Sequence, residues 1–231
     1  MKDIYVYDNT NVLINKLNIK NSQELDQVEG NMVSLLMGDI IVHPFKIESV
    51  FDIKTIHKML FSDLYEWAGE IRKINIYKQE QVLDGLSVNY SDYKNIERDL
   101  NNLDRYFKSI KWSELKHKII IKEVVKVISK LWRVHCFREG NTRTTTVFLY
   151  LLMKQIKLKV NMDFIGKHSK YFRNALVLAS IDQYSEYEHL EAILMDSISL
   201  KKTINGEEKY QTIRGYDLDK YEYNYHHIKE D

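Results

Sequence analysis

Residues that interrupt helices are scarce in this chain of 231 residues, which contains one proline and eight glycines. A proline inside a helix costs about 3 kcal/mol, and a glycine about 1 kcal/mol, relative to alanine. Folds built from many short strands also need glycine and proline at their turns. The scarcity of both residues therefore favours long helices and predicts an all-α fold.

Apolar residues recur at helical spacing in several separate segments, for example at Val28 and Met32. We expect helices within residues 10–40, 52–68, 91–108, 112–133, 144–157, 168–180 and 183–198. Pro44 and Gly69 would mark the ends of the first two. Residues 112–133 are apolar on more than one face, which predicts a central buried helix.

Residues 71–90 follow a different pattern. Ile74 and Ile76 alternate with polar residues, Gly85 supplies a turn, and the residues after it alternate again. Alternation with a period of two is typical of strands. This segment therefore predicts a short β-hairpin or flap.

The chain length suits one domain with an attached arm. We expect an N-terminal helical arm over residues 1–47 and a main domain over residues 48–200. A tyrosine-rich tail would follow over residues 201–231.

The overall composition narrows the class of protein. A formal net charge of +1 gives no electrostatic reason to expect a nucleic-acid partner. The opening residues, MKDIYVYDNTN, lack the apolar core of a secretory signal, and no apolar run approaches the ~18 residues that span a bilayer. The single Cys136 rules out an intramolecular disulfide. We therefore expect a cytoplasmic protein that binds neither nucleic acid nor membrane.

The segment from His135 to Arg143, HCFREGNTR, concentrates several reactive groups between two apolar helical segments. Gly140 beside Asn141 at a helix start can turn backbone N–H groups towards a di- or triphosphate. Arg143 adds a forked donor for phosphate oxygens, and Glu139 offers oxygen ligands suited to Mg²⁺. His135 titrates near neutrality and can accept a proton from an attacking hydroxyl.

Each of these residues also has an ordinary structural explanation. His135 can be a hydrogen-bonded core residue, and Glu139 with Arg143 can form a helix-surface ion pair worth ~0.3–0.5 kcal/mol. A Gly-Asn pair is common as a helix cap or turn. The combination at this spacing nevertheless favours a nucleotide site.

The same segment resembles the signature of the Fic family, His-Pro-Phe-x-(Asp/Glu)-Gly-Asn-Gly-Arg-x-x-Arg. Residues 60–72 and 75–78 resemble the segment that leads into the family's flap, and residues 171–175 resemble a downstream helix. The resemblance spans about residues 48–195, so the main domain would be the Fic domain. It implies the helical Fic fold and the transfer of AMP from ATP, with Mg²⁺, to a Ser, Thr or Tyr hydroxyl of a target protein or of the chain itself.

The resemblance also implies a role for each residue that matches the motif. His135 would be the general base on the target hydroxyl, and Glu139 would hold Mg²⁺. The implied nucleotide cradle consists of Gly140, Asn141, Thr142 and Arg143, with Arg143 on the β-phosphate. The implied target-binding flap consists of Ile74, Asn75, Ile76 and Lys78.

Three positions depart from the family pattern. Cys136 replaces the proline, and Thr142 replaces the second glycine, where a Cβ would enter the cradle and resist a positive φ. Thr146 stands where the family has its final arginine, which meets the γ-phosphate and pairs with an inhibitory glutamate. The missing arginine leaves open how the γ-phosphate is held and whether a glutamate inhibits the site.

The N-terminal arm contains a partial match to the inhibitory element. Glu29-Gly30-Asn31 fits the end of the family's Ser/Thr-x-x-x-Glu-Gly/Asn pattern, although Leu25 occupies the Ser/Thr position. One hypothesis is that the arm lies over the nucleotide site with Glu29 as the inhibitory residue. The alternative is that Glu29 is an ordinary residue on the polar face of an amphipathic helix.

Two other functions stay open at this point. A Doc-like protein kinase would use the nucleotide in reverse and transfer the γ-phosphate, and the variation at Thr142 is compatible with it. A Fic-fold interaction module without transfer chemistry would explain Thr146 in place of arginine. Donors such as UTP or CDP-choline, and a homo-oligomer, are also compatible with the sequence.

Overall fold

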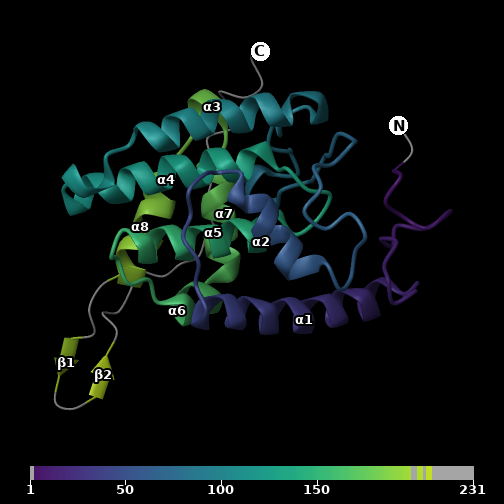
Figure 1. The fold of residues 1–231 in the computed structure, drawn as a ribbon, viewed down its shortest axis with the longest axis horizontal. Helices are drawn as coiled ribbons and strands as arrows, with labels where there is room; N and C mark the ends of the chain where they lie inside the picture. The colour runs from purple at the N-terminus through teal and green to yellow at the C-terminus, as the bar shows by residue number, and fades with distance from the viewer. Residues whose placement is uncertain (1–2, 199–201, 205–206, 210–231) are drawn as a thin grey trace.

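The computed structural model describes residues 3–198, 202–204 and 207–209. These residues form eight α helices, four short 3₁₀ turns and one two-stranded antiparallel hairpin (Figure 1). The α helices are α1 (Ser22–Val42), α2 (Asp52–Phe61), α3 (Ile96–Ser109), α4 (His117–Val134), α5 (Asn141–Gln155), α6 (Met162–Lys167), α7 (Ser169–Leu178) and α8 (Glu188–Ile198). The 3₁₀ turns are η1 (Gln81–Leu83), η2 (Tyr93–Asn95), η3 (Trp112–Glu114) and η4 (Asp182–Tyr184), and the strands are β1 (Lys202–Ile204) and β2 (Glu207–Lys209). The body of the fold is helical, as predicted, and the predicted tyrosine-rich tail lies almost entirely outside the described residues.

Two buried helices, α4 and α5, form the centre of the bundle. α4 packs against α3, α5, α7 and α8, while α5 also packs against α1 and α2. Val124, Val127 and Ile128 of α4 are fully buried, as are Phe148 and Leu152 of α5. Burying such a side chain stabilises the fold by roughly 1.5–3 kcal/mol. The predicted central helix is therefore confirmed, and the loop between α4 and α5 has a firm support on both sides.

α1 begins later than the apolar spacing of residues 10–40 predicts. The side chain of Asn21 caps the helix by accepting the backbone N–H of Glu24 at 3.0 Å. Before the cap, the Asn15 amide donates to the carbonyls of Leu13 and Ile19 at 2.9 and 2.7 Å. These bonds fold the preceding residues into turns, so the first part of the predicted helix is wrong.

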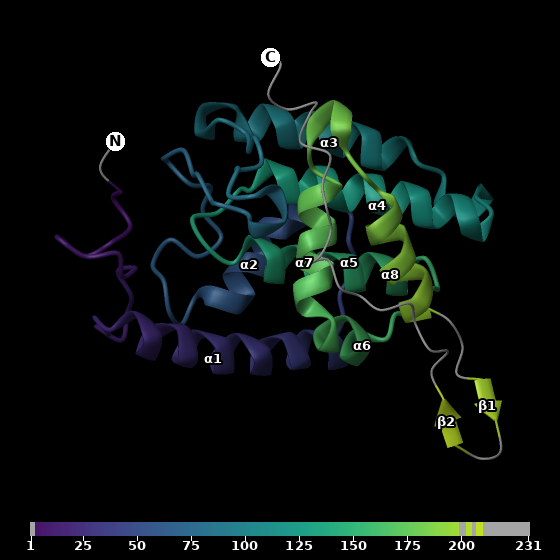
Figure 2. The same ribbon diagram turned by 180° about the vertical axis from the view of Figure 1, so that it is seen from behind.

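The helical arm lies against the bundle. α1 packs against α2 and α5, and it runs along one side of the molecule in both views (Figures 1 and 2). It ends at Val42, shortly before Pro44, as predicted. This packing brings the middle of α1 close to the start of α5.

α2 ends at Phe61, and not near Gly69 as the sequence predicts. Residues 62–69 form turns. Gly69 has a φ of +82°, and its N–H donates to Nδ1 of His57 at 2.8 Å. Gly69 therefore closes a turn that folds back onto α2.

The predicted β-hairpin in residues 71–90 forms no strands, although the chain does double back there. The reversal is centred on η1, where the Glu80 N–H donates to the Leu86 carbonyl and the Gly85 N–H to the Glu80 carbonyl, both at 3.0 Å. Beyond this point Lys78 pairs through its N–H with the Ser87 hydroxyl at 3.3 Å. Because that contact uses a side chain, the two arms do not form a backbone ladder.

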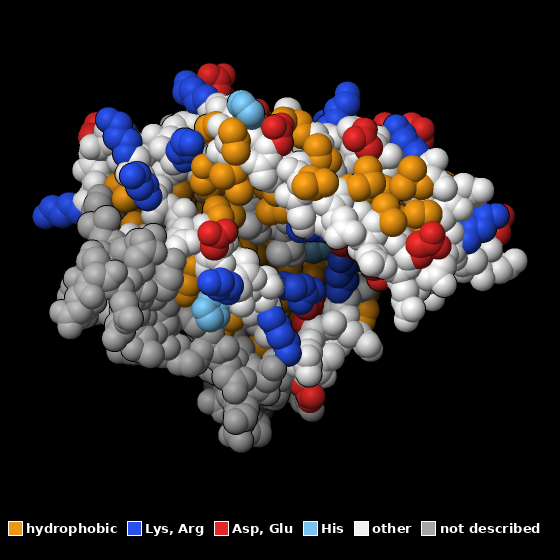
Figure 3. Space-filling model, turned by 90° about the horizontal axis from the view of Figure 1, so that it is seen from below, with side chains coloured by type: hydrophobic (Ala, Val, Ile, Leu, Met, Phe, Trp, Pro, Cys, Tyr) orange, Lys and Arg blue, Asp and Glu red, His pale blue; other side chains and the backbone are white. Residues whose placement is uncertain are grey.

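The surface agrees with the near-neutral composition. The face in Figure 3 carries Lys and Arg side chains interspersed with Asp and Glu side chains, with apolar groups between them. Among the described helices, none combines the length and apolar character that crossing a membrane requires.

Candidate functional site

The loop that joins α4 to α5 is shaped by two residues with positive φ. His135 ends α4 with a φ of +51°, and Gly140 precedes α5 with a φ of +79°. A Cβ on Gly140 would lie 2.4 Å from Cζ of Phe61, well inside van der Waals contact. Glycine is therefore required at this position both for its backbone conformation and for the close approach of α2.

The side chain of Asn141 braces the loop from within. Its Oδ1 accepts the backbone N–H of Phe137 at 3.0 Å, and its Nδ2 donates to the Phe137 carbonyl at 2.8 Å. Phe137 is fully buried, so these bonds pin an apolar anchor below the loop. The side-chain amide of Asn141 thus has a structural role, and the contribution of this residue to an anion site would come from its backbone.

His57 is a buried residue of the site that the sequence analysis did not identify. Its ring stacks on Phe137 at 3.8 Å between centroids. Because Nδ1 accepts the Gly69 N–H, Nε2 carries the proton and donates to the Glu139 carbonyl at 3.1 Å. Burial lowers the pKa of His57 to about 3, so the imidazole is neutral. The sequence signal that could have identified His57 is its position one turn after Ile53, on the apolar face of α2.

His135 is a buried histidine with one ring nitrogen that forms no hydrogen bond among the described residues. The ring is only 2% exposed, and its Nδ1 lies 3.2 Å from the Trp132 carbonyl. A carbonyl only accepts, so Nδ1 carries the proton and Nε2 keeps a lone pair. Nε2 has no hydrogen-bond partner among the described residues. Burial, followed by the charges of Lys78, Arg72 and Arg173, lowers the pKa of His135 well below its ordinary value and keeps this lone pair unprotonated.

Glu139 is an ionised carboxylate that already contacts a cation. Its Oε1 accepts the N–H of Gly140 at 2.9 Å, and its Oε2 lies 3.3 Å from the ammonium of Lys78. Burial raises the pKa of Glu139, but Lys78, the Gly140 N–H and Arg143 outweigh it, so the net pKa lies below its usual range. The structure therefore brings the predicted metal ligand and the predicted flap lysine together.

Arg143 contacts the arm rather than open solvent. Its guanidinium donates to the carboxylate of Glu29 on α1 and lies over the Phe61 ring, 5.1 Å from the centroid. The other carboxylate oxygen of Glu29 accepts the hydroxyl of Tyr65, and Glu29 is buried. Glu29 is thus not a residue of the exposed polar face. The arm lies at the motif, as one of the two hypotheses predicts.

Thr142 and Thr146 depart from the family pattern without strain. Thr142 lies within α5 and has no positive φ, because the positive φ before this helix falls on Gly140. The expected conflict at Thr142 is therefore absent. Its hydroxyl accepts the indole N–H of Trp132 at 3.0 Å, and Thr146 bonds within the helix to the Thr142 carbonyl at 2.8 Å.

The flap residues lie beside the motif in different settings. Ile74 is buried, Ile76 is half-buried, and the Asn75 amide bonds to the Asp92 carboxylate and the Tyr93 N–H at 2.9 Å. Within the described residues, the backbone of Ile76 forms no hydrogen bond.

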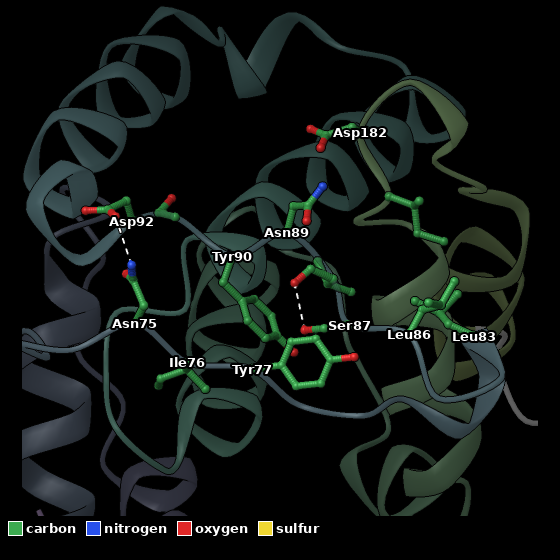
Figure 4. Close-up of a pocket in the computed structure, with 13 residues that line it drawn as sticks. Asn75, Ile76, Tyr77, Leu83, Leu86, Ser87, Asn89, Tyr90, Asp92 and Asp182 are labelled. Carbon is green, nitrogen blue, oxygen red and sulfur yellow. Dashed lines mark hydrogen bonds between the residues drawn. The ribbon is translucent and has the colours of Figure 1, made fainter. Parts of the chain in front are cut away.

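A pocket of about 530 Å³ lies between the two arms of the flap. Its walls come from residues 75–77 on one arm and residues 86–92 on the other (Figure 4). Ile181 and Asp182 line it further along the chain. This pocket is next to the loop that carries His135, because Tyr90 lines the pocket and stacks on the His135 ring.

Arg72 ties the flap to the motif, a role that the sequence analysis did not assign. Its side chain is buried and donates to three carbonyls, those of His135 at 2.7 Å, Ile74 at 2.6 Å and Ser91. The backbone N–H of Arg72 donates to the Cys136 carbonyl at 2.8 Å. One residue therefore joins both arms of the flap to the end of α4.

Comparison with known proteins identifies relatives of this chain. The Fic/DOC family model matches residues 48–153. The probable protein adenylyltransferase y4lH of Sinorhizobium fredii is 31% identical over 157 residues, which cover 67% of this chain and 77% of that protein. The protein adenylyltransferase VbhT of Bartonella schoenbuchensis is 26% identical over 206 residues, or 88% of this chain and 40% of VbhT. This chain therefore spans less than half the length of VbhT.

Solved structures share the same architecture. The BepC protein from Bartonella tribocorum, with bound AMPPNP, has a TM-score of 0.71 and 22% identity, with 86% of this chain and 97% of that chain covered. An N-terminal Fic domain from Bartonella quintana, with bound ADP, has a TM-score of 0.70 and 24% identity, with 84% and 93% covered. These likenesses confirm the predicted fold.

Proposed function

Because this chain belongs to the Fic/DOC family, we propose that it transfers AMP from ATP to a Ser, Thr or Tyr hydroxyl of a target protein. Relatives named protein adenylyltransferases support this activity at the level of the family. The observation that carries the proposal is Nε2 of His135, which has no hydrogen-bond partner among the described residues. This buried neutral base ends α4, and the short loop after it leads to the N-terminus of α5, whose first turn carries Arg143.

In the proposed reaction, the target hydroxyl oxygen attacks the α-phosphorus of ATP, the bond from this phosphorus to the bridging oxygen breaks, and pyrophosphate leaves. His135 accepts the hydroxyl proton on Nε2, a type of assistance that contributes about 10²–10⁴-fold in rate. The first N–H groups of α5 and the guanidinium of Arg143 would neutralise the phosphates. The hydroxyl of Thr142 accepts from Trp132, so its own proton can be donated to a phosphate oxygen.

Glu139 fits a divalent cation in this scheme. Its Oε2 already forms an ion pair with the ammonium group of Lys78, and the lowered pKa of the carboxyl keeps it ionised. The described residues contain no group of three or more His, Cys, Asp or Glu that would enclose a metal. Glu139 would therefore share Mg²⁺ with phosphate oxygens and water, the usual arrangement for this ion. Bound Mg²⁺ supplies charge neutralisation at the phosphates.

We further propose that α1 restrains the site through Glu29. Arg143 is the residue that the family motif assigns to the β-phosphate, and it is paired with the Glu29 carboxylate. A phosphate oxygen bound at Nη2 of Arg143 would compete with the Glu29 carboxylate for that donor. The hydrogen bond from Tyr65 supports this role because it fixes the Glu29 side chain. Inhibition in this chain would act on Arg143, because Thr146 replaces the final arginine of the family motif.

The flap is proposed to hold the target in an extended conformation beside His135. The free backbone groups at Ile76 suit the addition of a strand from the target. The pocket behind residues 75–77 would accept a target side chain next to the modified hydroxyl. Lys78 would leave Glu139 when Mg²⁺–ATP binds, and it would then contribute its charge to the nucleotide or the target.

Transfer from ATP labelled at either the α- or the γ-phosphate tests the proposed function. With Mg²⁺, we expect incorporation of the α label only, and we expect His135→Ala to reduce it by about 10²-fold or more. His43→Ala, at an exposed histidine, serves as the control and should keep full activity. Incorporation of the γ label alone would identify a Doc-like kinase. No incorporation, with no calorimetric binding of millimolar ATP, would identify a module without transfer chemistry.

A further inference from the structure

The His135 ring packs against two aromatic rings, one from the flap and one from α4. The Tyr90 ring stacks on the His135 ring, with centroids 3.9 Å apart and planes 30° from parallel. The indole of Trp132 meets the same ring edge-on at 5.3 Å. Stacked and edge-on contacts of this kind prefer a defined ring orientation. The two ring contacts therefore restrict rotation of the His135 side chain, which the single hydrogen bond from Nδ1 would still allow.

Tyr90 is itself held by the ion pair between Glu80 and Arg173. Its hydroxyl donates to Oε1 of Glu80 at 3.1 Å, and Glu80 is only 1% exposed. Arg173, from α7, donates to both oxygens of Glu80 at 2.5 and 3.0 Å. In Figure 4 the Tyr90 side chain reaches from the later arm of the flap towards the Ile76–Tyr77 arm. Arg173, Glu80 and Tyr90 therefore form a continuous series of contacts from α7 to the His135 ring.

We infer that Tyr90, Glu80 and Arg173 are positioning residues that hold the His135 ring with Nε2 directed at the reacting hydroxyl. A buried carboxylate is costly unless it is paired and hydrogen-bonded. Glu80 meets this condition through its two bonds from Arg173 and its bond from Tyr90. The pair thus fixes the turn between the two arms of the flap as well as the place of the Tyr90 ring. The inference rests on the proposed AMP transfer, because that reaction assigns the base role to His135.

The same enclosure explains why His135 stays neutral. Tyr90 and Trp132 keep water from the ring, and the charged groups around it are the cations Lys78, Arg72 and Arg173. Burial and these charges act in one direction, and both lower the pKa of His135. Replacing Tyr90 by leucine removes the ring without removing a charge. It therefore tests the enclosure separately from the cations.

The test compares Tyr90→Leu with Tyr90→Phe, which keeps the ring and loses only the hydroxyl. For Tyr90→Leu we expect kcat to fall by about 30-fold or more, with the KM and Kd of ATP unchanged, because base misplacement affects the transition state. The acid limb of the pH profile should move up towards pH 6.5, the pKa of an exposed histidine. Tyr90→Phe should stay within about 5-fold of wild type, since it loses one hydrogen bond.

Two further variants test the ion pair. Arg173→Met leaves Glu80 unpaired and should lower kcat by about 10-fold, whereas Arg173→Lys keeps the charge and should restore most of the loss. Tyr106→Leu is the matched control, because it removes another tyrosine–glutamate hydrogen bond, to Glu123, away from His135. It should leave kcat and the pH limb unchanged.

Either of two kinetic results would overturn the inference: a Tyr90→Leu enzyme with normal kcat and an unmoved pH limb, or losses that appear only in the KM of ATP. An NMR titration of His135 gives a readout that does not depend on turnover. If wild type transfers no AMP, the proposed function fails, yet a raised His135 pKa in Tyr90→Leu would still support the positioning. An unchanged His135 titration in that variant would refute the positioning whether or not AMP is transferred.

Discussion

The two ends of the loop between α4 and α5 are held by different kinds of contact. At the entrance, His135 is packed between the rings of Tyr90 and Trp132. At the exit, Arg143 is held by the carboxylate of Glu29, which comes from α1. The aromatic contacts at the entrance use no group that a nucleotide needs. The carboxylate at the exit occupies a group that a phosphate would need.

This difference separates a fixed part of the site from an adjustable one. A base works best when its orientation is set before the substrate binds, because no reorganisation is then needed in the transition state. A ligand shifts an equilibrium only through a difference in its contacts with the two states. In the proposed scheme ATP would gain such a difference at Arg143, where it would compete with Glu29, and not at His135. Regulation is therefore expected to act through phosphate binding and to leave the base in place.

The largest effect is expected at Gly140, which lies in the loop between His135 and Arg143. Gly140→Ala forces a positive φ, at about 1–2 kcal/mol, and a clash with Phe61 at about 1–3 kcal/mol. We expect the free energy of unfolding, measured with urea, to fall by about 2–5 kcal/mol. Gly85→Ala is the matched variant, since Gly85 has a φ of +85° but open space around it. Equal losses in both variants would mean that the approach of Phe61 contributes nothing.

The fixed contacts should also make stability depend on pH. The pKa of His57 is about 3 in the folded protein because of burial, against about 6.5 when unfolded. Below pH 6.5 the unfolded chain therefore binds a proton that the folded protein does not. Stability should fall by about 1.4 kcal/mol per pH unit as the pH drops from 6.5 towards 3. Urea denaturation at pH 7.5 and 5.5 measures this slope, which should be shallower in His57→Gln but unchanged in His43→Gln.

The local parts of this site could be predicted from the sequence. The apolar spacing of α4 and α5 and the motif between them depend on residues near one another in the chain, and the structure has both. The roles of His57 and Arg72 could not be found in this way. His57 acts on the carbonyl of Glu139, and Arg72 on the carbonyls of His135 and Ser91, all distant in sequence.

The flap shows why a correct pattern can predict the wrong element. Ile74 is buried while its neighbours are exposed, which gives the alternation of a strand. Beyond the backbone bond from Glu80 to Leu86 at the turn, the arms are nevertheless joined through the Ser87 hydroxyl and Arg72, and they form no backbone ladder. Alternation reports which side of an extended chain is buried, and it does not report a partner strand.

The next prediction concerns the adjustable end. Glu29→Gly releases Arg143, and we expect it to raise the affinity for ATP and the rate of self-modification by about 10-fold, within the usual range of coupling energies. Gln27→Gly is the control, because it places the same glycine at an exposed position of the same helix. It should change neither quantity. Unchanged auto-AMPylation in Glu29→Gly would exclude inhibition through Glu29.

The smallest effect is expected at Thr142, whose hydroxyl lies at the start of α5 and also contacts Trp132, the neighbour of His135. It accepts the indole N–H of Trp132, whose ring also packs on His135, and its proton is available for a phosphate. Thr142→Val removes both contacts at nearly constant volume, and we expect the affinity for ATP to fall by about 3–10-fold. Thr142→Ser should retain it. If Thr142→Val lowers kcat while ATP binds normally, the hydroxyl supports the base through Trp132, and the division between a fixed base and an adjustable phosphate end would not hold at this residue.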